Sequence, residues 1–171
     1  DRLMRTLLEQ LSDFPDAYVG FNITLEELAY QDAALDMHEQ IQNALDYPER
    51  KIVLEISESA IHSRTDEEIV RLEMTKLHAF GYAIALDDFG VESSNLKRLQ
   101  DFPIDILKLD KVLISDIATD LRQRKTVFSL SQMVSALGSK VIVEGVETKQ
   151  QSQFRGVRGW PVHQASFPAN P

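Results

Sequence analysis

The sequence contains no cysteine, so it can form neither a disulfide bond nor a thiolate metal site. No segment is apolar for long enough to cross a membrane as a helix. The first ten residues form a charged amphipathic segment, which is unlike a secretory signal. These absences favour a reducing compartment, and we expect a cytoplasmic location.

Positive charge is also scarce. The sequence has 18 Lys and Arg residues and 27 Asp and Glu residues, which gives a formal net charge of −9. An acidic surface is a poor partner for duplex nucleic acid, which needs its phosphates neutralised. A small phosphorylated ligand is not excluded, because clustered carboxylates can hold metal ions that then meet the phosphate.

The apolar content is high enough for a globular core, since 43% of the residues are hydrophobic. Apolar periodicity predicts an alternation of strands and helices along the chain. Strands are expected at 17–23, 51–56, 82–86, 104–109, 140–143 and, more weakly, 160–167. Helices are expected at the N-terminus and at 24–44, 65–80, 94–100, 121–137 and 148–154. Thr24 with Glu27, and Thr65 with Glu68, have the spacing of capping boxes that begin helices.

This alternation predicts a parallel sheet with helices packed outside it. In the helix at 65–80, we expect one face to be formed by Ile69, Leu72, Leu77 and Phe80. An open doubly wound sheet stays an alternative to a barrel. Such sheets usually carry a glycine-rich first turn, whereas this chain has seven glycines and no G-x-G-x-x-G pattern.

Polar residues recur where the predicted strands end. They are Asn22, Glu55 with Glu58, Asp87 with Asp88, Lys108 with Asp110, Glu144, and Gln164. Any one of them alone is more often a helix cap, a turn residue or a surface side chain. Their coincidence on successive strands is typical of (β/α)8 barrels, which place catalytic groups at this end. The Asn, Asp and Glu residues of this group offer only oxygen atoms as metal ligands. Such ligands suit Mg²⁺ or Mn²⁺ better than zinc or copper.

Several segments together resemble one family. VLEISESAI at 53–61, ALDDFG at 85–90, FPIDILKLD at 102–110 and VIVEGVET at 141–148 are similar, in this order, to motifs of EAL domains. FNIT at 21–24 and the spacing of Gly159, Gln164 and Pro171 resemble further family motifs. The resemblance implies an α/β fold, the (β/α)8 TIM-like barrel of the EAL type. It also implies metal-dependent hydrolysis of cyclic di-GMP to the linear dinucleotide.

By position, the resemblance implies first-metal ligands at Asn22, Glu55 and Asp87, and second-metal ligands or neighbours at Asp87, Asp88 and Glu144. It implies catalytic roles for Lys108, which would orient or activate the attacking water, and for Glu144. Glu58, Asp110 and Gln164 are implied as supporting or substrate-contacting residues. The cofactor would be Mg²⁺ or Mn²⁺ in a two-metal site. Cyclic di-GMP would be the ligand, and a homodimer and an upstream sensory or GGDEF domain are left open.

Three departures from the family pattern qualify this expectation. The Glu-Ala-Leu signature strand is not in the chain, so we expect residues 1–171 to form a single EAL-type domain that lacks its first strand or strands and a helix. The segment after DDFG has Glu92 where the family has glycine, and Gln164 is followed by Ala165. These changes favour an alternative, a catalytically weak or inactive module that binds cyclic di-GMP or a protein partner. A different metal-dependent barrel, such as an enolase-type lyase, explains DDFG and VEGVE less well.

Overall fold

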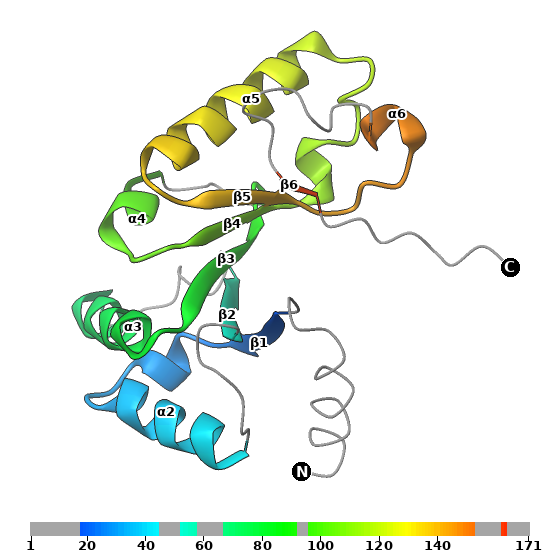
Figure 1. Ribbon diagram of the computed structural model, residues 1–171. Coiled ribbons are helices and arrows are strands. Elements are labelled where there is room, and N and C mark those ends of the chain that lie inside the picture. The colour runs from blue at the N-terminus through cyan, green and yellow to red at the C-terminus, as the bar shows by residue number, and fades with distance from the viewer. Residues whose placement is uncertain (1–17, 45–51, 58–66, 92–95, 153–161, 164–171) are drawn as a thin grey trace, which may run out of the picture.

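The computed structural model describes residues 18–44, 52–57, 67–91, 96–152 and 162–163. Strands and helices alternate through these residues (Figure 1). The strands are β1 (Val19–Ile23), β2 (Ile52–Ser57), β3 (Ala83–Phe89), β4 (Ile106–Leu109), β5 (Lys140–Val143) and β6 (Val162–His163). The helices are α2 (Ala33–Ala44), α3 (Glu67–Phe80), α4 (Leu96–Asp101), α5 (Leu121–Ala136) and α6 (Lys149–Ser152), with short 3-10 helices η1 (Glu26–Leu28) and η4 (Lys111–Leu113).

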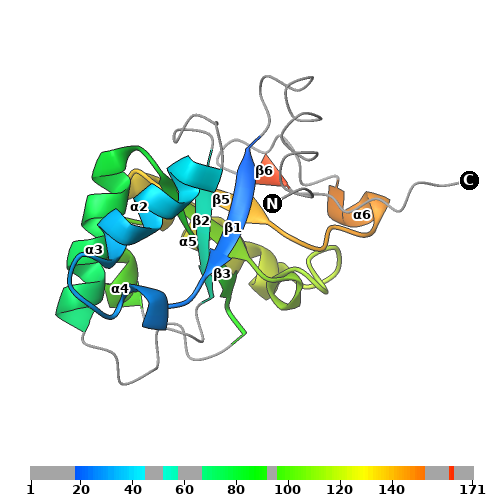
Figure 2. The ribbon, with the colours of Figure 1, turned by 90° about the horizontal axis from the view of Figure 1, so that it is seen from below.

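The strands form one parallel sheet in the order of the sequence, β1-β2-β3-β4-β5-β6. A doubly wound sheet reverses its strand order and covers both faces with helices. Here the order never reverses, and α2, α3, α4 and α5 lie along the outer side of a curved sheet (Figures 1 and 2). The described part is therefore an incomplete (β/α) barrel, as the sequence predicted, and the doubly wound alternative is wrong.

Alternate residues of each strand point to opposite faces, and the two faces differ in chemistry. The outward face joins the helices in one apolar core, to which the strands contribute Phe21, Ile23, Ile52, Leu54, Ile56, Ile84, Leu86, Phe89, Leu107, Leu109, Val141 and Val143. The inward positions between them carry glycine, alanine and the polar residues singled out in the sequence, together with Val53, Ile106 and Ile142. One residue of shift in any strand would exchange these faces, so the apolar alternation fixes the register.

The predicted helix at 24–44 is interrupted. Its capping box forms, because Thr24 N donates to Oε2 of Glu27 at 2.7 Å and Glu27 N donates to Oγ1 of Thr24 at 3.4 Å. The turn that follows is the 3-10 helix η1, and Asp32 then adopts a φ of 67° before α2 begins at Ala33. A left-handed residue cannot continue a right-handed helix, so the segment divides there.

The face expected for α3 agrees with the structure only in part. Leu72 is 52% exposed and Phe80 is 37% exposed. The buried residues are Val70, Glu73, Met74 and Leu77, so Leu77 is the one member of the expected face that is buried. The spacing of apolar residues did not reveal this face, because one of its central residues is the glutamate Glu73.

Buried Glu73 has a structural task at the start of the neighbouring helix. Its Oε2 accepts a hydrogen bond from Ala34 N at 2.9 Å, and its Oε1 lies 2.7 Å from Lys76 Nζ. A carboxylate at a helix N-terminus satisfies N–H groups that lack partners within the helix. Glu73 therefore joins α3 to α2 through a polar contact inside an apolar layer.

The remaining predicted elements agree with the structure to within a few residues. The expected N-terminal helix, Thr65 of the second capping box, and most of the expected strand at 160–167 lie outside the described residues. No helix in the described ranges is long and apolar enough to cross a membrane.

Candidate functional site

Lys108 lies at the centre of the polar end of the sheet. It extends inward from β4 and is only 7% exposed. Its Nζ lies 2.9 Å from Oε2 of Glu55 on β2, 2.8 Å from Oδ2 of Asp87 on β3, and 2.9 Å from Oε1 of Glu144 at the end of β5. Four predicted site residues from four neighbouring strands thus converge on one point.

The charges of this cluster do not balance. Three carboxylates and one ammonium group carry a net charge of −2 if all are ionised. Burial by itself would lower the pKa of Lys108, but the hydrogen bonds to Asp87, Glu55 and Glu144 outweigh it and raise the pKa. Lys108 therefore stays protonated at neutral pH, and the cluster retains an excess of negative charge that favours a further cation.

A β-bulge sets the positions of the two adjacent aspartates. Leu86 pairs with Leu107 and Phe89 pairs with Leu109, so Asp87 and Asp88 together stand opposite the single residue Lys108. Asp88 adopts a left-handed φ of 56° within this bulge. Asp87 faces inward by the ordinary alternation of the strand, and the extra residue returns Phe89 to the core.

Asp88 lies beside this cluster and is exposed. Partial burial raises the pKa of its carboxyl group, and the negative charges of Asp87 and Asp110 raise it further. Lys108 acts in the opposite direction but does not cancel these effects. Asp87, Asp88 and Asp110 thus lie close enough at this end of β3 and β4 for their negative charges to interact.

Asn22 occupies the matching position on β1. It is the Cα partner of Glu55 in the parallel register between β1 and β2. The side chains of Phe21 and Ile23 pack toward the core, so Asn22 belongs to the inward face. The structure therefore brings Asn22 to the same end of the sheet as Glu55, Asp87, Lys108 and Glu144.

The inner face of the sheet borders a cavity of about 820 Å³ that includes Glu55 and Lys108. Small side chains widen it, because Gly20, Ala83 and Ala85 line its wall. Lower in the sheet, Asp105 links the strands: its Oδ2 accepts from Ile84 N at 2.9 Å, and its Oδ1 lies 3.1 Å from Nε2 of His78. The motif FPIDILKLD thus contributes one strand-bridging aspartate as well as Lys108.

The other predicted site residues have different outcomes. Asp110 caps η4, because its Oδ1 accepts a hydrogen bond from Val112 N at 2.8 Å. This contact orders the segment directly after the strand that carries Lys108. Glu58 and Gln164 lie outside the described residues, so their predicted roles stay predictions.

The donor chemistry of the cluster fits a hard divalent cation. Glu55, Asp87 and Glu144 offer carboxylate oxygens, and Asn22 adds an amide oxygen on the neighbouring strand. Such oxygens are the ligands that Mg²⁺ and Mn²⁺ prefer. Within the described ranges no three acidic or histidine side chains are arranged to hold a metal ion by themselves. Lys108 contacts three of the predicted metal ligands, Glu55, Asp87 and Glu144. To bind a metal ion, each of these carboxylates must either use its second oxygen or give up its contact with Lys108.

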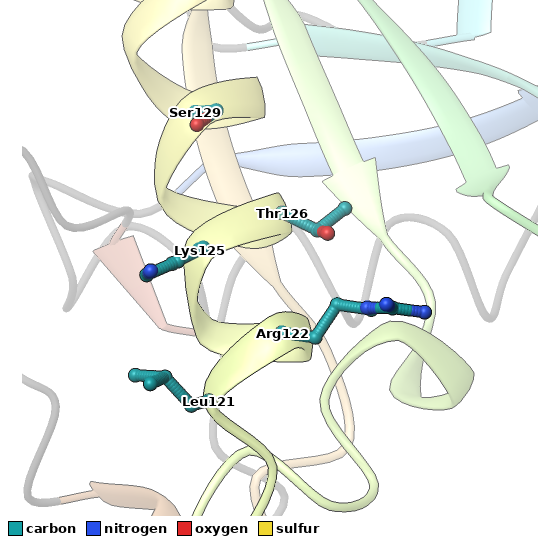
Figure 3. Close-up of a pocket in the computed structure, with 5 residues that line it drawn as sticks. All are labelled: Leu121, Arg122, Lys125, Thr126 and Ser129. Carbon is teal, nitrogen blue, oxygen red and sulfur yellow. The ribbon is translucent and has the colours of Figure 1, made fainter.

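A second hollow lies on the surface of α5. Figure 3 shows its lining, the side chains of Leu121, Arg122, Lys125, Thr126 and Ser129. All five belong to one helix, and none is a predicted site residue. We therefore place the candidate site at the carboxyl ends of the strands.

Comparison with known proteins identifies the family of the chain. The family model described as EAL domain matches residues 1–162. The bifunctional diguanylate cyclase/cyclic di-GMP phosphodiesterase MucR of Pseudomonas aeruginosa is 31% identical over 140 residues, which cover 80% of this chain and 20% of MucR. The chain thus spans about a fifth of the length of that relative.

Solved structures show the same fold. The EAL enzyme Bd1971, bound to cAMP and cyclic di-GMP, superposes with a TM-score of 0.80 at 26% identity over 94% of this chain and 43% of that one. The manganese and cyclic di-GMP complex of BlrP1 from Klebsiella pneumoniae has a TM-score of 0.74 at 26% identity, over 85% of this chain and 36% of that one. From the family match and the shared fold, the chain belongs to the EAL domain family.

Proposed function

We propose that this chain hydrolyses one phosphodiester bond of cyclic di-GMP and releases the linear dinucleotide. The observation that carries the proposal is the contact of Lys108 with carboxylates from three strands, at the end of the sheet where barrel enzymes hold their substrates. The similarity to MucR and to enzymes solved with cyclic di-GMP supports this choice of substrate.

The reaction needs divalent cations, which we propose are Mg²⁺ or Mn²⁺. Glu55, Asp87 and Asn22 would hold one ion, and Asp87, Asp88 and Glu144 a second. When bound, such ions supply a water of lowered pKa and neutralise the charge of the phosphodiester. The net charge of the carboxylate cluster supports this assignment, because Lys108 compensates only part of it.

Lys108 would act as a fixed cation in this reaction. Its raised pKa makes it a poor proton acceptor at neutral pH, which favours an orienting role over removal of a proton from water. An ammonium group at this position can donate hydrogen bonds to the attacking water and to an anionic phosphate oxygen. Glu55, Asp87 and Glu144 limit its motion from three sides.

Two assays on the purified chain test the proposal. In the first, cyclic di-GMP is incubated with the chain and Mn²⁺, and the linear dinucleotide is measured by chromatography. In the second, binding of cyclic di-GMP is measured by calorimetry. We expect turnover by the wild type, loss of turnover with retained binding for Lys108→Ala, and unchanged turnover for Lys125→Ala, which removes an exposed lysine on α5. Binding without any product would favour the alternative function, a receptor.

The wider expectations for the protein remain proposals of ours. We propose that residues 1–171 belong to a single EAL-type domain, and that the protein is cytoplasmic and forms a homodimer. A partner GGDEF or sensory domain fits the bifunctional name of the relative MucR. Analytical ultracentrifugation would decide between monomer and homodimer.

A further inference from the structure

Gly20 on β1 faces the carboxylate of Glu55. A Cβ atom placed on Gly20 would lie 2.5 Å from Oε1 of Glu55, 3.1 Å from its Cδ and 3.7 Å from its Cγ. Real Cβ atoms essentially never approach another heavy atom to 2.5 Å. The carboxylate thus occupies space that any residue other than glycine would fill.

Backbone conformation does not explain this glycine. Gly90, Gly138 and Gly145 have φ values of 103°, 89° and 65°, which L-residues rarely adopt. Gly20 is not among the positive-φ glycines and lies within a regular strand, where its pairing with Val53 continues the ladder. A glycine inside a strand gives up side-chain packing, and it often marks a place where another group approaches closely.

The approaching group is one end of a bridge between three strands. While Oε1 of Glu55 lies against Gly20 of β1, Oε2 of the same carboxylate lies 2.9 Å from Lys108 Nζ of β4. Two features therefore fix the direction of the Glu55 carboxylate. They are the free space beside Gly20 and the ion pair with Lys108.

We propose that Gly20 is a positioning residue, whose missing side chain sets where the Glu55 carboxylate lies. This inference deepens the proposed function, on which it rests, because Glu55 is one of the residues assigned to metal binding. An alanine at position 20 would displace the carboxylate, which is the far end of a flexible side chain, and would leave the strand backbone in place. Replacement of Gly20 by alanine should therefore alter the position of Glu55 in the site without unfolding the protein.

The test compares the full chain with Gly20→Ala by three measurements. A crystal structure of metal-free Gly20→Ala should show the Glu55 carboxylate moved away from β1 and its contact with Lys108 Nζ lengthened or broken. Calorimetric titration with Mn²⁺ should show affinity lower by about 10-fold, the lower end of the effect of losing a group that orients a metal ligand. Thermal unfolding should occur within a few degrees of the wild type.

A shorter acid provides the matched control. Glu55→Asp removes one methylene, so it should weaken Mn²⁺ binding in the wild-type background but cost little further in the Gly20→Ala background. This non-additivity is expected when both substitutions act on the same carboxylate. If the substitution at position 20 simply unfolded the protein, the melting temperature would fall in both the Gly20→Ala single variant and the double variant.

The outcomes separate the inference from the proposed function. If Gly20→Ala retains the Glu55–Lys108 contact in the crystal and binds Mn²⁺ like the wild type, the positioning role is overturned. If the wild type binds no Mn²⁺, the proposed metal site fails, and the crystal structure alone then decides the role of Gly20. A large drop in melting temperature for Gly20→Ala would also overturn the inference in favour of a structural role.

Discussion

Lys108 Nζ lies 2.8 Å from Oδ2 of Asp87, beside a bulge that sets two residues of β3 against one of β4. The same ammonium group contacts Glu55 and Glu144, so one cation holds together three carboxylates that would otherwise repel one another. Lys108 therefore contributes to the stability of the metal-free fold, apart from its role in the proposed reaction.

Replacement of this lysine should destabilise the metal-free protein. We expect Lys108→Met to lower the free energy of unfolding by about 2 kcal/mol, below the roughly 3–5 kcal/mol for breaking a fully buried ion pair, because its partners keep contact with water. The Glu55, Asp87 and Glu144 side chains are 22%, 17% and 30% exposed. Urea unfolding followed by circular dichroism measures the change.

Manganese should partly replace the missing charge in this variant. Without Lys108 the three carboxylates have more to gain from a bound cation, so Mn²⁺ should raise the melting temperature of Lys108→Met more than that of the wild type. Lys140→Met, which removes an exposed cation of β5, serves as the control and should change stability by less than about 0.5 kcal/mol. A Lys108→Met protein as stable as the wild type would contradict the role of Lys108 as a counter-ion.

Asp87 should dominate metal affinity among the single carboxylates, because it is assigned to both ions. We expect Asp87→Asn to bind Mn²⁺ about 10–100-fold more weakly in calorimetry, a range typical of damage to a metal site. Asp101→Asn on α4 removes an exposed carboxylate near Lys97 and should leave affinity unchanged. Equal affinity in wild type and Asp87→Asn would remove Asp87 from the proposed site.

Glu73 should make stability depend on pH in a defined window. Burial by itself would raise its pKa, but the hydrogen bonds from Lys76 and from Ala34 N outweigh it and lower the pKa below 4.5. A lowered carboxyl pKa contributes stability that is complete above the unfolded value and is lost as pH falls through the folded value. The contribution should therefore be constant near neutral pH and decline below about pH 4.5.

Glu73→Gln tests this window. At pH 7 we expect it to lower the free energy of unfolding by about 2 kcal/mol, since it weakens charged hydrogen bonds in a buried place. The difference from wild type should shrink as the pH is lowered below 4.5, in urea titrations at a series of pH values. Glu39→Gln, on the exposed face of α2, is the control and should change the free energy of unfolding at pH 7 by less than about 0.5 kcal/mol. A difference independent of pH would mean that the charge of Glu73 does not matter.

Much of this architecture could be predicted from the sequence. Apolar alternation identified the strands, and the placement of Asn22, Glu55, Asp87, Lys108 and Glu144 at their ends predicted that these residues meet. Parallel strands in sequence order bring their carboxyl ends to one edge, so the strand assignment alone was sufficient for that conclusion.

Other features depend on tertiary contacts that leave no local signal. In the sequence Glu73 resembles a surface glutamate, because its partners, Ala34 and Lys76, lie on another helix and one turn away. The bulge at Asp87 and Asp88 is visible only from the pairing with β4. Gly20 gave no sign of its role, since the group that needs its space is 35 positions further along the chain.

Gly90, which follows Phe89 in the DDFG segment, should be far less tolerant of substitution than Gly138, although both have positive φ values, 103° and 89°. A Cβ on Gly138 would meet nothing within 4 Å, whereas one on Gly90 would overlap the side chain of Leu113 in η4. Gly138→Ala should therefore cost only backbone strain, about 1–2 kcal/mol. Gly90→Ala should cost about 1–3 kcal/mol more, because Leu113 has to move.

The comparison of these two variants isolates that overlap and links it to the site. Leu113 belongs to η4, the short helix that Asp110 caps directly after the strand of Lys108. Displacement of η4 by Gly90→Ala should therefore also lower Mn²⁺ affinity, while Gly138→Ala, at the far end of α5, should leave it unchanged. Urea unfolding and Mn²⁺ calorimetry on both variants measure the two effects. If both variants lose the same stability, Leu113 can move aside without a measurable loss of free energy. If Gly90→Ala binds Mn²⁺ as tightly as the wild type, the position of η4 does not influence the carboxylate cluster.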